Sequence, residues 1–115
     1  MVNPTEQDIK KDIGEAYNSI DGTTVMVVNN LIERAKKRVI AISGTTTGNS
    51  QDLAIRSFAD VYALQHVLAG LGPDTVGQDS MMEMRDFFME EANMALKVIG
   101  KSKDGDHFHI AKAND

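Results

Sequence analysis

Residues Val25–Ile42, with the sequence VMVVNNLIERAKKRVIAI, decide the fold class. Their apolar side chains recur at alternating intervals of three and four residues, which is the spacing of one face of an α-helix. The resulting seam consists of Val25, Val28, Ile32, Ala35, Val39 and Ile42. Val and Ile also favour strands, but the spacing is sustained and therefore predicts a helix. We expect Thr23 or Thr24 to cap its start and Gly44 to follow its end.

A shorter helix is expected before this one and a more apolar helix after it. The first begins behind the N-cap Thr5 and can end as early as Gly14, because glycine weakens a helix by about 1 kcal/mol relative to alanine. The later helix spans about residues 51–69, with Asn49 or Ser50 as its cap. Its apolar side chains cover most of its circumference, so it should lie at the centre of the fold.

The last expected helix opens with Ser80 and Glu83, which are spaced as a capping box, and stops at Gly100. The sequence thus predicts an all-α fold, a small four-helix bundle with a long central helix and an extended C-terminal tail. Residues 1–100 would form the helical domain and residues 101–115 the tail. The expected core includes Val28, Ile32, Val39, Phe58, Tyr62, Phe88 and Ile99.

Composition excludes several classes of function. The chain has 115 residues, no cysteine and a net charge of −5, so disulfides and zinc–thiolate sites are absent and general nucleic-acid binding is disfavoured. No apolar run approaches the roughly 20 residues that span a bilayer, and no membrane partner is expected.

The charge is distributed unevenly along the chain. Residues 23–44 carry one acid and four bases, whereas residues 73–100 carry six acids and two bases. The basic cluster of Arg34, Lys36, Lys37 and Arg38 fits a solvated face, an acidic neighbouring subunit or phosphate. An acidic set on the last helix, Glu83, Asp86 and Glu90, fits a solvated face or a complementary face for the next subunit. If these are complementary faces, Arg34, Lys37 and Arg38 of one subunit form charge pairs with Glu83, Asp86 and Glu90 of the next.

Other constellations point away from catalysis and cofactors. His107 and His109 would share one side of a strand, as in half a zinc site, but a third ligand is not evident. The carboxylates of the last helix lack a sheltered cleft and a second catalytic group. An enzyme with a carboxylate or histidine site would need a bound metal or a buried acid, whereas the expected core positions are uniformly apolar. We therefore expect no enzyme, no metal and no cofactor.

Several segments resemble, in order and spacing, the head–tail connector (adaptor) proteins of tailed bacteriophages. The resemblance covers roughly residues 5–100. The segments that carry it are TEQDIKKDIG at 5–14 followed by Asp21-Gly22, LIERAKKRV at 31–39 followed by Ser43-Gly44, AIRSFADVY at 54–62, and a final helix that stops at VIG, 98–100.

This resemblance implies a helical protein that forms a ring, typically of twelve copies, beneath the portal protein in the virion neck. The ring extends the DNA channel without sequence-specific binding and docks the stopper or tail-completion protein, after assembly in the host cytoplasm. It also implies that the C-terminal segment engages the portal. Here that segment would be a strand-like peptide with the residues His107, Phe108, His109 and Ile110, of which Phe108 and Ile110 are the apolar anchors.

An alternative function is a small helical regulatory or chaperone-like module that grips a partner helix. Met82, Phe87 and Met89 stray from the core-facing stripe of the last helix and would supply an adaptable apolar flank. Such a module would be a stable monomer or dimer, and its tail would be dispensable.

Overall fold

The first helix is short and is followed by a turn of 3₁₀-helix. The computed structural model describes residues 3–20, 24–71 and 75–107, of which 24 and 101–107 are described by their backbone alone. α1 spans Glu6–Ile13, and the backbone N–H of Thr5 donates to the Asp8 carboxylate at 2.9 Å, so the predicted N-cap is confirmed. Gly14, at φ +61°, ends α1 as expected, and the 3₁₀-helix η1 spans Gly14–Ser19.

α2 is the helix that the seam predicts, and it spans Thr24–Ser43. The four central seam residues are buried, whereas Val25 and Ile42 at its ends are 51% and 41% exposed. Gly44 follows at φ +82° and donates its N–H to the carbonyl of Ile40, which confirms its predicted role. Thr24 is the first helical residue, and the alternative cap Thr23 lies outside the described residues.

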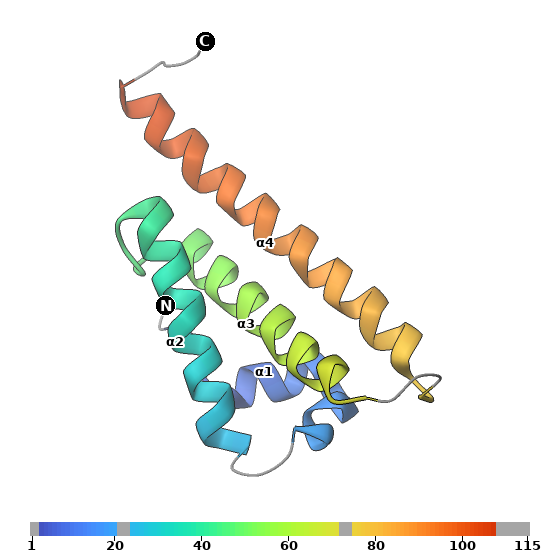
Figure 1. The fold of residues 1–115 in the computed structure, drawn as a ribbon. Coiled ribbons are helices and arrows are strands. Elements are labelled where there is room, and N and C mark those ends of the chain that lie inside the picture. The colour runs from blue at the N-terminus through green and yellow to red at the C-terminus, as the bar shows by residue number, and fades with distance from the viewer. Residues whose placement is uncertain (1–2, 21–23, 72–74, 108–115) are drawn as a thin grey trace.

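α3 spans Asn49–Ala69 and is the most buried helix. It packs against α4, α2 and α1, and Figure 1 shows it lying between α2 and α4. The predicted central position of this helix is therefore confirmed. The predicted cap is wrong, because Asn49 and Ser50 are already helical and Gly48 stands at the N-cap.

α4 is the longest helix and spans Gln78–His107. The predicted start at Ser80 is wrong because the helix begins two residues earlier, which leaves Ser80 and Glu83 no capping role. The predicted stop at Gly100 is also wrong, since α4 continues to His107 and residues 101–107 are helical instead of extended. A single glycine costs a helix only about 1 kcal/mol, too little to end it. Residues 108–115 lie outside the described residues.

The described residues form an all-helical fold with four α-helices, as expected. Figure 1 shows α1 lying across the direction of α2 and α3, while α4 runs at an angle to α2 and projects beyond the other helices at its C-terminal end. The molecule is elongated, with extents of 48 × 27 × 18 Å. Of the predicted core, Phe88 is only partly buried, and the residues confirmed as buried are Val28, Ile32, Val39, Phe58, Tyr62 and Ile99.

The expectation of a uniformly apolar core is wrong. Three polar side chains of α3, those of Asp52, Ser57 and Asp60, are buried. A helix that contacts neighbours on nearly every side buries its polar positions together with its apolar ones.

Candidate functional site

Two arginines of α2 lie over the aromatic rings of α3. The Arg34 guanidinium carbon is 4.6 Å from the centre of the Tyr62 ring, and that of Arg38 is 4.4 Å from the centre of the Phe58 ring. Arg38 also donates through Nη1 to the Tyr62 hydroxyl at 3.2 Å. Cation–π contact and a hydrogen bond therefore hold both guanidinium groups in place.

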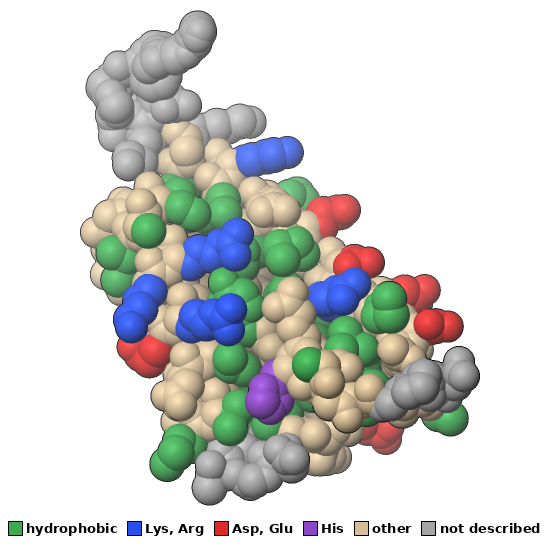
Figure 2. Space-filling model, viewed as in Figure 1, with side chains coloured by type: hydrophobic (Ala, Val, Ile, Leu, Met, Phe, Trp, Pro, Cys, Tyr) green, Lys and Arg blue, Asp and Glu red, His purple; other side chains and the backbone are tan. Residues whose placement is uncertain are grey.

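The helical repeat explains this arrangement. Arg34 and Arg38 are four residues apart on α2, as Phe58 and Tyr62 are on α3, so each pair occupies one side of its helix. The two rings are stacked, with their centres 6.2 Å apart. Both rings are buried, whereas both arginines are exposed. The guanidinium groups thus form a fixed positive layer over the core, and Figure 2 shows Lys and Arg side chains gathered on this face.

The two lysines of the basic cluster differ from its arginines. Lys36 forms an ion pair with Glu33 at 2.9 Å, one turn away on the same helix. Lys37 is exposed and points away from the seam. We define the basic face of α2 as Arg34, Lys37 and Arg38.

The acidic residues of α4 form a ridge of exposed side chains. Glu83, Asp86 and Glu90 lie on the side of the helix opposite its core-facing residues, and all three are exposed. Asp86 pairs with the adjacent Arg85 at 3.2 Å. In the described part of the chain, no ion pair joins this acidic ridge to the basic face of α2.

An apolar stripe runs along α4 beside the acidic ridge. Phe87, Met94 and Val98 are 57%, 55% and 52% exposed, and their spacing of seven and four residues places them on one side of the helix. The rings of Phe87 and Phe88 meet edge to face, with the ring centres 5.3 Å apart. Of the residues flagged from sequence, Met82 is exposed and Met89 is partly buried. Sequence reasoning missed Met94 and Val98, although their heptad-like spacing from Phe87 was visible.

A partly buried charged cluster joins α1 to α3, and sequence reasoning missed it as well. Arg56 donates to both carboxylate oxygens of Asp12 at 2.7 Å, while Asp60, also on α3, is 1% exposed. Burial raises the pKa of Asp12, but the hydrogen bonds from Arg56 and Asp60 and the Arg56 charge outweigh it and lower that pKa. Asp60 is a buried acid, yet its seclusion from solvent leaves no room for a substrate beside it.

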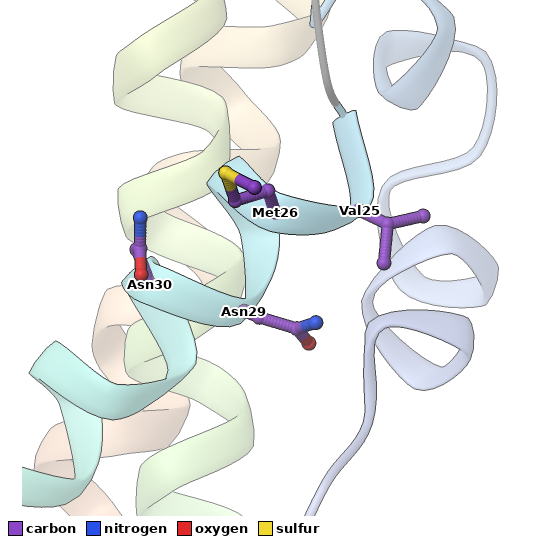
Figure 3. A pocket seen from close by; sticks show the side chains of 4 residues that line it. All are labelled: Val25, Met26, Asn29 and Asn30. Carbon is purple, nitrogen blue, oxygen red and sulfur yellow. The ribbon is translucent and has the colours of Figure 1, made fainter.

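Two surface hollows lie near helix ends. One, of about 500 Å³, lies at the start of α2, where Figure 3 shows Val25, Met26, Asn29 and Asn30. The other, of about 630 Å³, lies between the α1–η1 junction and the start of α4. Both are shallow hollows at the molecular surface. Ser19, Ser80, Asp12 and Glu15 help to line the second, but among the described residues no hydrogen bond joins either serine hydroxyl to a carboxylate.

Metal-binding and membrane-spanning features are not found in the described ranges. Within residues 3–20, 25–71 and 75–100, whose side chains the structure describes, three or more His, Asp or Glu side chains do not meet in a metal-binding group. None of the helices in the described part of the chain has both the length and the apolarity needed to cross a membrane. The predicted pair His107 and His109 lies at and beyond the end of the described chain, and the predicted docking residues Phe108 and Ile110 lie outside it.

Comparison of the chain with protein-family models, with curated proteins and with solved structures finds no match.

Proposed function

We propose that this protein is a structural head–tail connector of a tailed bacteriophage, which forms a ring under the portal protein. One observation carries the proposal. The basic face of α2 and the acidic ridge of α4 are both exposed and do not pair with each other within the described chain. Oppositely charged patches at different places on one molecule favour head-to-tail contacts between copies, and such contacts close into a ring when the rotation permits.

The structure of the basic face supports this role. The two guanidinium groups are already fixed by Tyr62 and Phe58, so little side-chain entropy is lost when a carboxylate binds them. In the contact we propose, Glu83 and Glu90 of one copy approach Arg34 and Arg38 of the next.

The apolar stripe of α4 supplies the remaining contact area. Phe87, Met94 and Val98 lie beside the acidic ridge and would be covered by the neighbouring copy. Aromatic and methionine side chains are enriched in interface cores. Apolar contacts beside charged pairs are typical of an ordinary protein–protein interface.

In the assembled virion the ring would lie in the neck, extend the DNA channel and dock the stopper or tail-completion protein. An acidic chain around the channel fits this position, because like charge keeps DNA from adhering to it. The segment after α4, residues 108–115, would engage the portal, with Phe108 and Ile110 as anchors.

Binding to the portal tests the whole proposal. The purified chain and a version ending at Gly100 are each mixed with the portal ring encoded in the same genome, and native mass spectrometry counts the bound copies. We expect saturable binding of about one copy per portal subunit and loss of binding on truncation. No binding by the intact chain would refute the connector function.

Charge reversal tests the contact between copies. Changing Glu83, Asp86 and Glu90 together to lysine should prevent ring formation while the helical content stays unchanged. Reversing the three residues of the basic face in the same chain should restore assembly. A matched control is Glu15→Lys, a reversal on the exposed surface of η1, which should assemble normally. Assembly by the triple reversal alone would exclude this pairing.

A second candidate function rests on the apolar stripe alone. Its exposed Phe87, Met94 and Val98 are also what a helical regulatory or chaperone-like module would use to hold a partner helix. This alternative predicts a monomer or dimer at all concentrations tested and no effect of removing residues 101–115.

A further inference from the structure

One tyrosine of α3 brings the two arginines of the basic face together. The Arg34 guanidinium lies over the Tyr62 ring, with its carbon 4.6 Å from the ring centre. Arg38 donates through Nη1 to the hydroxyl of the same tyrosine at 3.2 Å, and its guanidinium carbon lies 4.4 Å from the centre of the Phe58 ring. The two rings are themselves stacked. The two positive charges are therefore neighbours above one aromatic pair, although they come from successive turns of α2.

Most hydrogen-bond donors of the two guanidinium groups remain unused. A guanidinium carries several N–H donors in a planar fork, and Arg38 spends one of them on Tyr62. Among the residues that the structure describes, no carboxylate forms an ion pair with Arg34 or Arg38. Both arginines are exposed, so an anion can reach these donors from solvent.

The number of forks favours a phosphate group over a carboxylate. A guanidinium fork binds two oxygen atoms of an anion at once. A carboxylate has only two oxygens and so fills one fork, whereas the three terminal oxygens of a phosphate monoester can serve two forks that share one oxygen. A phosphate dianion also matches the two positive charges of Arg34 and Arg38.

The charge of the surrounding protein favours a compact anion over a long one. The basic face consists of three residues, and the chain as a whole carries a net charge of −5. A nucleic-acid backbone that reached beyond Arg34 and Arg38 would meet acidic surface and would be repelled. A single phosphate group meets the two guanidinium groups alone.

We propose that Arg34 and Arg38 form a binding site for one phosphate group, presented as inorganic phosphate or as a small phosphate monoester. Each guanidinium donates to two phosphate oxygens, while Tyr62 and Phe58 hold the two groups in place, so that little side-chain entropy is lost on binding. The site lies within one copy of the chain and does not depend on the connector function. It shares its arginines with the contact that we propose between copies, so binding is measured where the chain is monomeric.

NMR of the arginine side chains tests the site directly. The Nε–Hε signals of the ¹⁵N-labelled chain are followed while inorganic phosphate is added at pH 8, where its second ionisation is nearly complete, and at a constant ionic strength of about 0.15 M. The signals of Arg34 and Arg38 should shift together and saturate, with a dissociation constant on the order of 1 mM. Acetate at the same ionic strength should bind at least about tenfold more weakly.

Three variants separate a built site from diffuse attraction. Arg34→Lys and Arg38→Lys keep the charge and lose the fork, so each should weaken phosphate binding about tenfold. Lys37→Gln removes a charge from the same exposed face and should change the affinity less than about twofold. All three positions are exposed, so these variants should fold normally, and the amide spectrum checks that they do.

The ligands themselves supply the remaining outcomes. Tighter binding of glycerol 3-phosphate than of inorganic phosphate would assign the site to a monoester, and the reverse order would assign it to the free ion. The proposal would be overturned by unsaturable shifts, by lysine variants that bind like the natural chain, or by a Lys37→Gln loss as large as theirs. Tighter binding of an oligothymidylate without terminal phosphates would also overturn it, in favour of a nucleic-acid surface.

Discussion

Two phenylalanines of equal size should respond very differently to replacement by alanine. Phe58 is 0% exposed, stacks on Tyr62 and lies beneath Arg38, whereas Phe87 is 57% exposed and meets one neighbouring ring edge to face. Truncating a buried phenylalanine removes its transfer free energy and leaves a cavity, which together cost about 3–5 kcal/mol. The lost contact with Arg38 adds about 0.5–1 kcal/mol.

The same reasoning gives a much smaller value for Phe87. The edge-to-face contact with Phe88 contributes about 0.5–1.5 kcal/mol beyond burial. Because the Phe87 ring is largely exposed, its truncation removes little buried apolar surface. We therefore expect Phe87→Ala to lower the free energy of unfolding by about 1 kcal/mol and Phe58→Ala by about 4 kcal/mol. The second loss is a large part of the roughly 5–15 kcal/mol that stabilises an ordinary domain.

Urea unfolding followed by circular dichroism at 222 nm measures both losses, and it suits a chain that has no tryptophan. The measurement is made at a concentration where the chain is monomeric, because Phe87 is also a proposed contact between copies. Equal losses for the two variants, or a loss below about 1 kcal/mol for Phe58→Ala, would contradict the placement of the Phe58 ring in the core.

Three further outcomes are expected. Between pH 4 and pH 10 the folded chain keeps the Asp60 proton that the unfolded chain has lost, so its stability should fall as pH rises. The free energy of unfolding relative to Asp60→Asn should drop by about 2.7 kcal/mol from pH 6 to pH 8 in urea titrations. Gly100→Ala should raise the free energy of unfolding by about 0.5–1 kcal/mol, since Gly100 is helical and an added Cβ meets nothing within 4 Å. Gly48→Ala should lower the thermal midpoint, because Gly48 has φ +131° and its Cβ would press on the Gln51 side chain.

The positions of the helices could be predicted because each carries its own periodic signal. The seam of α2 lies within one helix, and the burial of Val28, Ile32, Ala35 and Val39 follows from their spacing alone. The boundaries were less accurate, because one glycine at position 100 and one Ser–Glu spacing at position 80 are weak signals. A glycine inside a helix costs only about 1 kcal/mol, so the helix can continue through it.

The candidate site was only partly predictable, for a different reason. The exposed charges of α2 and α4 follow from their positions opposite the apolar stripes. The stacking of Arg34 on Tyr62 depends on the register between two helices, which no local pattern encodes. The partly buried charged cluster did have a signal, because Arg56 and Asp60 are four residues apart in a helix that is apolar nearly all round. Such a helix has few solvent-facing positions on which to place a charge.

The length of α4 has a mechanical consequence. α4 has 30 residues and α3 has 21, so α4 outreaches the helix that supports it by about 13 Å at a rise of 1.5 Å per residue. Figure 1 shows this overhang at the C-terminal end. A force applied to the end of α4 would act with leverage on Ala92 and Ala95, its buried contacts near the middle. A partner that tilts the end of α4 would therefore tilt the rest of the bundle with it, because the helix moves as one rigid body.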